Sequence, residues 1–297
     1  IIPYKELASG LSRVGESWEL SGMPGSESVV AEGPWAGSTL SELIGRFGAE
    51  LLGKANYARF GQEFPLLVKF IDAREDLSIQ VHPDDELARK RHGKSGKCEM
   101  WYVLEAEPGA SLLTGFSRPI APAEYERRVA DNTLTDVLNR QAIASGDVFY
   151  LPAGRVHRIG KGSFIVEIQQ SSDITYRIYD FDRRDAAGNS RELHTELARE
   201  AIDFESSENS RITYAPENNQ EVRLVTTPYF TTSLYTLTAR TRCDWSATDS
   251  FVAIVLLQGS GSLTDNEGNR IDVRQGETWL LPASTQWTEI TPHTAMP

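Results

Sequence analysis

Apolar and polar residues alternate with a period of two through much of the chain, and this pattern predicts a mainly β protein. The segment 77–82 is a clear example: Leu77, Ile79 and Val81 lie on one face of the predicted strand, and Gln80 and His82 lie on the other. Similar patterns predict strands over 15–20, 65–71, 97–104, 146–152, 163–169 and 174–180. Short strands follow at regular spacing over 223–227, 230–239, 251–258, 261–265 and 271–281, as in a sandwich or barrel.

Three segments depart from the strand pattern and predict helices. Residues 38–45 predict a short helix capped by Ser38 or Ser41. Around 119–140, apolar residues recur every three to four positions behind two prolines, which predicts a helical excursion between strands. A further helix is predicted around 190–203. We therefore expect a β protein in which the helices are small additions.

The polar stretch 205–221 has the composition of a linker. A chain of 297 residues is long enough for one large domain or two ordinary ones, each with its own core. We therefore expect a first domain over 1–204 that contains the helical excursion, and a second β domain over 222–297.

Charge and cysteine content restrict the partners and the compartment. The net charge of −12 argues against nucleic acid or an anionic membrane surface as a partner. The longest apolar run, 251–257, is far too short to span a bilayer. Two cysteines, Cys98 and Cys243, cannot form a disulfide framework, which favours a reducing, cytoplasmic setting.

A set of metal-ligating side chains is predicted where three strands meet. If the strand that carries Gln80 and His82 neighbours the strand that opens at Lys97, then Glu99 can converge on the same point. The glycine turn after Pro152 predicts a hairpin that returns His157 to this face. The alternative is that both histidines are merely hydrogen-bonded within the sheet.

Basic and aromatic side chains near these strands have two interpretations each. Lys69 interrupts an apolar strand, so its ammonium reaches either an anion in a cavity or, on an edge strand, the solvent. Arg177 shares a face with polar neighbours and suits a phosphate or an oxyanion, and the alternative is a structural ion pair with Asp173, Asp180 or Glu167. Trp18 either lines a site or packs in the core.

One stretch of the chain is repeated. Gly276 to Ser284 aligns with Gly146 to Gly154, and in both a glycine and a proline stand six positions apart around an apolar strand. Trp287 stands where His157 would fall. The repeat therefore keeps the fold pattern and lacks a ligand, and we expect one metal site per chain.

With these residues identified, a family resemblance can be stated. The pattern from Gly146 to His157 is similar to the second half of a cupin motif. The runs PLLVKFIDAREDLSIQVHPDD, GKCEMWYVL and EIQQSSDITYRIYDFDR resemble type I mannose-6-phosphate isomerases of the short bacterial form over most of the first 185 residues. The resemblance implies two cupin-like β-barrels or jelly rolls, of which the N-terminal one binds metal and the C-terminal one is degenerate.

The resemblance also implies an activity and a set of site residues. The reaction is the reversible conversion of mannose 6-phosphate to fructose 6-phosphate through a cis-enediol. One Zn²⁺ per chain would be held by Gln80, His82, Glu99 and His157. The family's active-site arginine falls on Arg177, and its other substrate-pocket positions fall on Lys69, Ser78, Lys97, Glu167 and Asp173, with Arg183 as a phosphate-side position and Trp18 as a further residue that can line the pocket.

The proton carrier and the exact activity stay open at this point. An ammonium beside a divalent cation and an arginine gives up its proton more readily, which favours Lys97, while Asp173 and Glu167 remain alternatives. The alternative functions are another cupin metalloenzyme acting on a sugar phosphate, or a sugar-phosphate-binding cupin without activity. In each case we expect a small-molecule partner and a monomer or weak homo-oligomer.

Overall fold

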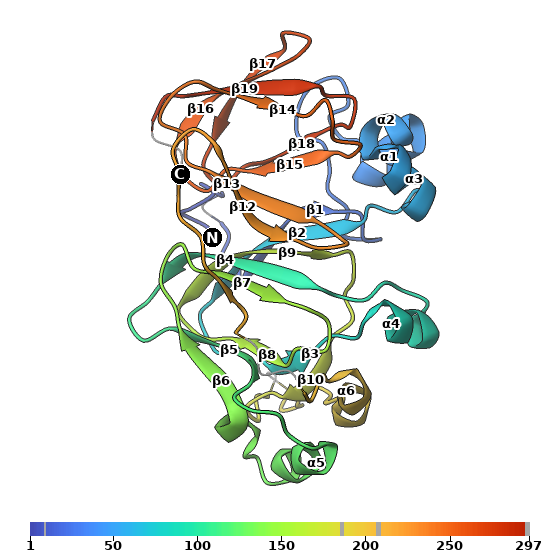
Figure 1. Ribbon diagram of the computed structural model, residues 1–297, viewed down its shortest axis with the longest axis vertical. Helices are drawn as coiled ribbons and strands as arrows, with labels where there is room; N and C mark the ends of the chain where they lie inside the picture. Colours follow the sequence, from blue (N-terminus) through green and yellow to red (C-terminus); the bar gives the residue numbers. More distant parts are fainter. Residues whose placement is uncertain (9, 185–186, 206–208, 295–297) are drawn as a thin grey trace. The chain divides into compact units, whose positions relative to one another are not determined.

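The computed structural model describes residues 1–8, 10–184, 187–205 and 209–294, which fall into two compact units. One unit contains residues 1–69 and 213–297, and the other contains residues 70–212. Strands dominate both, and the helices are few (Figure 1), so the predicted mainly β class is confirmed. Among the described residues, no helix is both long and apolar enough to cross a membrane.

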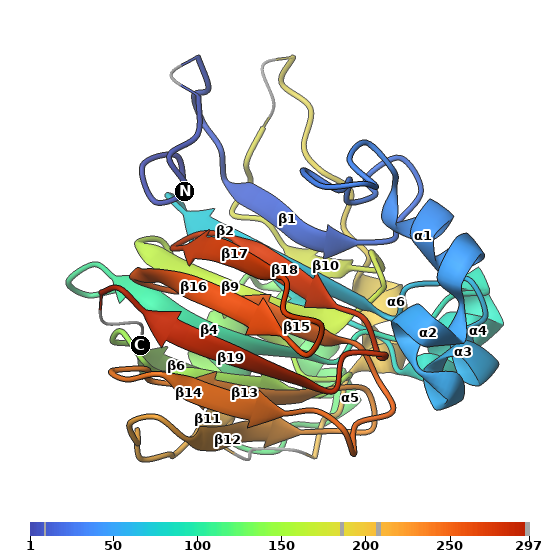
Figure 2. The ribbon, with the colours of Figure 1, turned by 90° about the horizontal axis from the view of Figure 1, so that it is seen from above.

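The unit of residues 70–212 consists of two layers of strands with helices outside one layer. One layer has β9, β4, β7 and β11 as neighbours in that order, and the other is a five-stranded sheet in the order β10-β3-β8-β5-β6. In the view from above in Figure 2, β9, β4, β10, β6 and β11 of this unit can be made out. The strands are β3 (Ile79–Val81), β4 (Glu99–Ala106), β5 (Ser111–Phe116), β6 (Leu138–Ala142), β7 (Val148–Leu151), β8 (His157–Ile159), β9 (Ser163–Gln170), β10 (Tyr176–Tyr179) and β11 (Arg211–Ile212).

Two apolar clusters occupy the two sides of the five-stranded sheet. Trp101, Phe149 and Ile165 from the first layer pack with Leu112 and Ile159 from the second, so a core lies between the layers. The opposite side of the five-stranded sheet carries Ile79, Val81 and Ile178, which pack with helical residues. The helices of this unit are α4 (Asp85–His92), α5 (Pro122–Ala130), the 3-10 helix η1 (Leu134–Val137) and α6 (Thr195–Ala201). The helical excursion around 119–140 and the helix around 190–203 are therefore present, although both are shorter than expected.

Among its described residues, the other unit combines three short helices with eight strands from the C-terminal part of the chain. The helices are α1 (Leu40–Phe47), α2 (Ala49–Leu52) and α3 (Lys54–Phe60). The sheet β14-β19-β16-β17 and the pairs β12-β13 and β15-β18 contain the late strands, which are β12 (Glu221–Thr226), β13 (Thr231–Tyr235), β14 (Thr241–Asp244), β15 (Val252–Val255), β16 (Ser260–Asp265), β17 (Arg270–Arg274), β18 (Thr278–Leu281) and β19 (Trp287–Pro292). β1 (Glu16–Ser21) also belongs to this unit, and β2 (Leu66–Ala73) crosses the boundary at residue 69.

The compact units differ in their boundaries from the predicted division at 204–222. Residues 1–69 group with the C-terminal strands because α2 and α3 bind them directly: the backbone amide of Lys54 donates to Asp249 Oδ1 at 2.7 Å, and that of Ala283 donates to the Leu51 carbonyl at 2.9 Å. Residues 206–208 of the predicted linker and the last residues, 295–297, lie outside the described residues. The predicted functional division into two domains stays a prediction.

Two local predictions need correction. The cap of α1 is Thr39, whose hydroxyl accepts from the Glu42 amide while the Glu42 side chain accepts from the Thr39 amide, and neither Ser38 nor Ser41 has this role. The predicted strand over 271–281 is two strands, because Gly276 adopts a φ of 82° in the turn between them.

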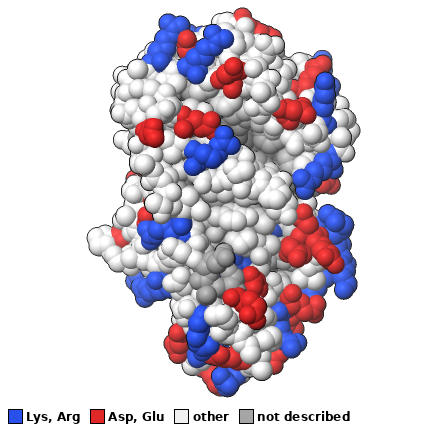
Figure 3. Space-filling view, in the orientation of Figure 1, with Lys and Arg blue, Asp and Glu red and all other residues white. Residues whose placement is uncertain are grey.

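The surface of the molecule carries both signs of charge. In the view of Figure 3, Lys and Arg side chains are interspersed with Asp and Glu side chains over both units. The net charge of −12 is therefore not concentrated on one acidic patch in this view. A local group of basic residues can therefore make the electrostatic potential of a site positive although the net charge of the chain is negative.

Candidate active site

A row of polar side chains crosses the five-stranded sheet on its inner face. Arg177 on β10 lies opposite Gln80 on β3, Gln80 lies opposite His157 on β8, and His157 lies opposite Thr114 on β5. Residues that face each other across neighbouring strands point to the same side of a sheet. Because Ile79 and Val81 pack in the outer cluster, the alternation of β3 turns Gln80 inward.

A second row faces inward from the other layer. Glu99 on β4 lies opposite Gln169 on β9, and Trp101 lies opposite Glu167. The Trp101 indole N–H donates to Glu167 Oε2 at 2.9 Å, which holds this buried carboxylate in one orientation. The interior between the two layers therefore contains carboxylates, amides and imidazoles at one end of an otherwise apolar core.

Gln80, His82, Glu99 and His157 come together between these rows. His157 Nε2 lies 3.1 Å from Glu99 Oε1, and His82 Nε2 lies 3.5 Å from Glu99 Oε2. The Gln80 amide nitrogen lies 3.3 Å from His157 Nε2, and exchanging the amide N and O would present the oxygen there. Ligand atoms of the two histidines and Glu99 all lie within 4.8 Å of one another. The structure thus brings the four predicted ligands together.

Both histidines are oriented by backbone carbonyls. His82 Nδ1 donates to the Ile174 carbonyl at 2.7 Å, and His157 Nδ1 donates to the Arg155 carbonyl at 2.8 Å. Burial lowers the pKa of His157 to about 4, so this ring is neutral near pH 7. With the proton fixed on Nδ1, the lone pair of Nε2 faces inward, as in metal-ligating histidines.

This orientation fits a divalent cation. Glu99 is fully buried, and its carboxylate oxygen lies directly against the unprotonated Nε2 of His157. Two electron-pair acceptors at this separation repel each other, whereas a cation between them binds both. Two imidazoles, one carboxylate and one amide form a donor set that suits Zn²⁺. A catalytic site of this kind also requires an open coordination position for one more ligand.

Lys97 lies beside the same group. Its Nζ is 3.1 Å from Glu99 Oε2 and 3.2 Å from His82 Nε2, and the side chain is buried. A buried ammonium is retained only where it has an anionic or polar partner, which Glu99 supplies. The structure therefore places Lys97 directly beside Glu99 and His82. Its predicted role as the proton carrier stays a prediction.

Arg177 keeps hydrogen-bond donors available on the inner face. Its Nη1 donates to the Glu192 carbonyl at 2.9 Å, while its Nε has no hydrogen-bond partner among the described residues. Within those residues it makes no ion pair, because Asp173 binds Lys94 and Asp180 binds Arg183 and Arg191. Burial lowers the pKa of Arg177 from its usual value, but a guanidinium stays charged at neutral pH. The charges of Asp180 and Glu192 still attract the guanidinium. The role of Arg177 at the site therefore stays a prediction.

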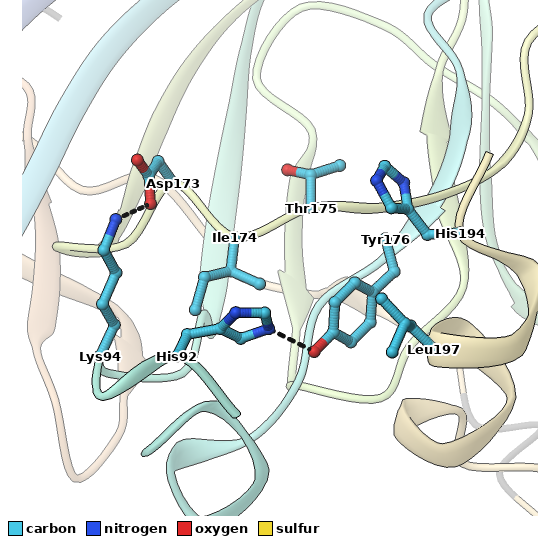
Figure 4. Close-up of a pocket in the computed structure, with 8 residues that line it drawn as sticks. All are labelled: His92, Lys94, Asp173, Ile174, Thr175, Tyr176, His194 and Leu197. Atoms are coloured by element: carbon cyan, nitrogen blue, oxygen red, sulfur yellow. Dashed lines mark hydrogen bonds and ion pairs between the residues drawn. The ribbon is translucent and has the colours of Figure 1, made fainter. Parts of the chain in front are cut away.

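Asp173 and Arg183 make their side-chain contacts with residues other than the four predicted ligands. Asp173 is half exposed, binds Lys94 at 2.8 Å and lines a cavity of about 390 Å³ together with His92, Tyr176 and His194 (Figure 4). Arg183 binds the Asp180 side chain and donates to the Asp76 carbonyl at 2.7 Å, so its guanidinium has structural partners. Their predicted roles in catalysis and phosphate binding stay predictions.

The remaining predicted substrate residues are less informative. Ser78 is buried two positions before Gln80. Lys69 and Trp18 belong to the other unit, where Lys69 Nζ lies 5.0 Å from the centre of the Trp18 ring and 3.7 Å from Glu16. Their contribution to the pocket stays a prediction.

Two side chains near these residues were not predicted from the sequence. Gln169 is buried opposite Glu99, and its Oε1 has no hydrogen-bond partner among the described residues. Its position two residues after Glu167 was a usable signal, because alternation puts both on one face. His194 contacts the backbone of Arg177, and no motif around it indicates this.

Comparisons with known proteins identify relatives of this chain. A family model described as phosphomannose isomerase type I, catalytic domain, matches residues 9–114. A mannose-6-phosphate isomerase of Streptococcus mutans is 35% identical over 269 residues, which cover 90% of this chain and 82% of that protein. Mannose-6-phosphate isomerase ManA of Bacillus subtilis is 35% identical over 274 residues, covering 91% of this chain and 84% of the relative.

Solved structures of phosphomannose isomerases share the fold of this chain. The crystal structure of the mannose 6-phosphate isomerase from Bacillus subtilis superposes with a TM-score of 0.88 at 30% identity, over 99% of this chain and 92% of that one. A phosphomannose isomerase variant from Salmonella typhimurium gives a TM-score of 0.78 at 16% identity, over 99% of this chain and 93% of that one. The second likeness concerns the fold alone.

Proposed function

This chain belongs to the type I phosphomannose isomerase family, and on that premise we propose that it interconverts mannose 6-phosphate and fructose 6-phosphate with the help of one Zn²⁺. The observation that carries the proposal is the meeting of His82, Glu99 and His157, whose ligand atoms lie within 4.8 Å of one another. Beside them stand an ammonium and a guanidinium, from Lys97 and Arg177, which suit an anionic reaction intermediate.

The reaction moves one proton between C1 and C2 of the sugar, and O1 and O2 exchange carbonyl and hydroxyl character through a cis-enediol. Negative charge develops on these two oxygens when the proton leaves carbon. A bound Zn²⁺ acts as a Lewis acid that stabilises this charge. Gln80, His82, Glu99 and His157 would hold it, and one carboxylate among these ligands leaves the ion a net positive charge.

Side chains of the protein supply the remaining steps. Arg177 would donate from Nε or Nη2 to the enediol oxygens, because preorganised donors stabilise charge that appears in the transition state. Lys97 is our choice of proton carrier, since its Nζ lies 3.1 Å from Glu99 and can pass a proton to a sugar atom bound there. Glu167 is the alternative base. Its orientation is fixed by Trp101, which favours a single defined proton-transfer distance.

Binding of the substrate calls for positive charge around the phosphate. We propose Lys69 and Arg183 for this role, with Ser78 and Trp18 lining the sugar side. The cupin-like nature of both β domains, a cytoplasmic location and a monomer or weak homo-oligomer belong to the same proposal. Two buried free cysteines, Cys98 and Cys243, are compatible with a reducing compartment.

A coupled assay tests the activity and the metal together. Fructose 6-phosphate formed from mannose 6-phosphate is followed before and after chelation, and again after addition of Zn²⁺, Mn²⁺ or Mg²⁺. We expect turnover in the untreated protein, its loss on chelation and its return with Zn²⁺. Full turnover in protein shown to be metal-free would exclude the metal role, and absence of turnover in Zn²⁺-loaded protein would exclude the isomerase.

A further inference from the structure

Arg177 is held by a short segment that immediately precedes α6. The backbone amide of Arg177 donates to His194 Nδ1 at 3.3 Å, and the backbone amide of His194 donates to the Arg177 carbonyl at 2.7 Å. The carbonyl of Glu192 accepts from Arg177 Nη1 at 2.9 Å. Both backbone groups of Arg177 and one end of its guanidinium are therefore bound by residues 192–194.

The other contacts of the His194 side chain are loose, and its ring centre lies 6.4 Å from that of Tyr176. It is the N-cap residue of α6, yet its imidazole makes no capping hydrogen bond. Its Nε2 has a distant contact of 3.9 Å with the exposed Glu192 carboxylate. Among the described residues, the shortest polar contact of the ring is thus the one from the Arg177 amide to Nδ1, at 3.3 Å.

We propose that His194 is a positioning residue for Arg177, and that its Nδ1 sets the direction in which the guanidinium meets the sugar oxygens. This inference rests on the proposed function, in which Arg177 stabilises the enediol. Residue Arg177 lies on β10 at the position where the pairing with β3 shifts register, between Arg177 and Tyr179. The pairing of β10 with β3 is therefore irregular at this point. The two hydrogen bonds with His194 hold the Arg177 backbone from the side opposite β3.

The surroundings of His194 allow its role to be separated from packing. Figure 4 shows it on the wall of the cavity of about 390 Å³, together with His92 and Tyr176. Its side chain is 23% exposed, so truncation enlarges an existing space and leaves no sealed void. His92 provides a matched control, because it lines the same cavity and binds the Tyr176 hydroxyl at 2.8 Å without a contact to Arg177.

The test compares His194→Ala, His194→Asn, His194→Gln and His92→Ala in the Zn²⁺-loaded full chain. The Asn side-chain oxygen can occupy the place of Nδ1, whereas the Gln oxygen reaches only the place of Nε2. We expect kcat to fall about 10- to 100-fold in the Ala and Gln variants, since small misplacement of a catalytic group has effects of this size. KM, metal content and the unfolding midpoint should stay near wild type, and His194→Asn and His92→Ala should keep kcat within about 3-fold.

A double-mutant cycle links the effect to Arg177. His194→Ala should cost nothing further in an Arg177→Ala background, because there is then no guanidinium to position. Unchanged kcat in His194→Gln, or a full additional loss in the Arg177→Ala background, overturns the positioning role while leaving the isomerase proposal intact. Unchanged kcat in Arg177→Ala itself counts against the proposed mechanism and removes the basis of this inference. If His194→Ala lowers the unfolding midpoint, the difference in kcat between His194→Asn and His194→Gln decides whether His194 positions Arg177.

Discussion

The two units contain the same hairpin, once with a proposed metal ligand, His157, and once without it. In the first copy, the Gly146 amide donates to the Val103 carbonyl at 2.8 Å, and the Arg155 amide donates to the Pro152 carbonyl at 3.2 Å. In the second copy, the Gly276 amide donates to the Leu256 carbonyl at 2.8 Å, and the Thr285 amide donates to the Pro282 carbonyl at 2.9 Å. The backbone bonding of the repeat is thus preserved.

Side chains at equivalent register positions differ. Glu99 lies opposite Leu151 in the first copy, and Val252 lies opposite Leu281 in the second. Gln80 lies opposite His157, whereas Asp244 lies opposite Trp287. The equivalents of two ligands are therefore apolar or aromatic, and the remaining acid, Asp244, is exposed and accepts from the amide of Ser246.

This comparison separates what the hairpin needs for folding from what it needs for chemistry. Backbone hydrogen bonds and the glycine–proline spacing suffice to form the hairpin in both units. The proposed metal binding depends on a few side chains placed on that frame, as is general for sites carried by common folds. In the second copy, Arg242 stacks on the Trp287 ring at 4.0 Å and makes a structural contact at this position.

The largest effect is expected when the histidine of the first copy is removed, because the first hairpin then lacks the residue that distinguishes it from the second. His157→Ala should lower kcat/KM by about 10³-fold, because Lewis-acid stabilisation is worth several kcal/mol. Steady-state assay and metal analysis of the purified variant measure this loss together. Retained activity with full metal content would show that His157 is not a ligand.

The reciprocal change sharpens the comparison. Trp287→His should leave activity and metal content unchanged, because Val252 still stands at the Glu99 position. Metal analysis of the wild-type chain should give one ion, and this variant should give the same. Two ions per chain in either protein would contradict the view that the second copy lacks a site.

Removal of Arg177, which lies outside the repeated hairpin, should produce the next largest effect. Arg177→Ala should lower kcat by about 10²-fold or more, as the loss of an oxyanion donor does. Circular dichroism and the unfolding midpoint should match the wild type. An unchanged kcat would reduce Arg177 to a structural residue.

The last prediction concerns stability and the turns themselves. Gly154 has a φ of 84°, and a Cβ there would lie 3.0 Å from the Ala201 carbonyl oxygen, whereas Ser284 fills the same turn position in the second copy. Gly154→Ser should destabilise the protein by about 1–2 kcal/mol, since left-handed backbone disfavours residues with a Cβ. Ser284→Gly should cost only about 0.4–1 kcal/mol, mainly through the entropy of the unfolded chain. Urea unfolding of both variants measures the difference, and a reversed order would contradict it.

Much of the fold was readable from alternation, and the exceptions have physical causes. Strands β3, β7 and β9 follow from local patterns of apolar residues. The grouping of residues 1–69 with the C-terminal strands does not, because it depends on contacts such as Lys54 with Asp249, which are 195 positions apart. Helices α2 and α3 were not predicted, since each has fewer than eight residues and is bounded by glycines, too short for a helical period to be recognised.

The positions of the candidate ligands could be predicted as far as they depend on which face of a strand each side chain occupies. The meeting of Gln80, His82, Glu99 and His157 required the two-residue period and one hairpin, both visible in the sequence. The contact of His194 with Arg177 was not predicted, because the helix predicted around 190–203 included His194, whereas α6 begins only at Thr195. The domain assignment, the phosphate-binding residues and the proton carrier stay predictions.

The ammonium of Lys97 has a consequence for handling the protein. Because Nζ lies 3.1 Å from Glu99 Oε2, the buried carboxylate has a covalently tethered counter-ion that no chelator can extract. Stripping the metal should therefore leave a folded protein that regains turnover on reloading. Weakly active preparations are then best examined for metal occupancy before misfolding is suspected.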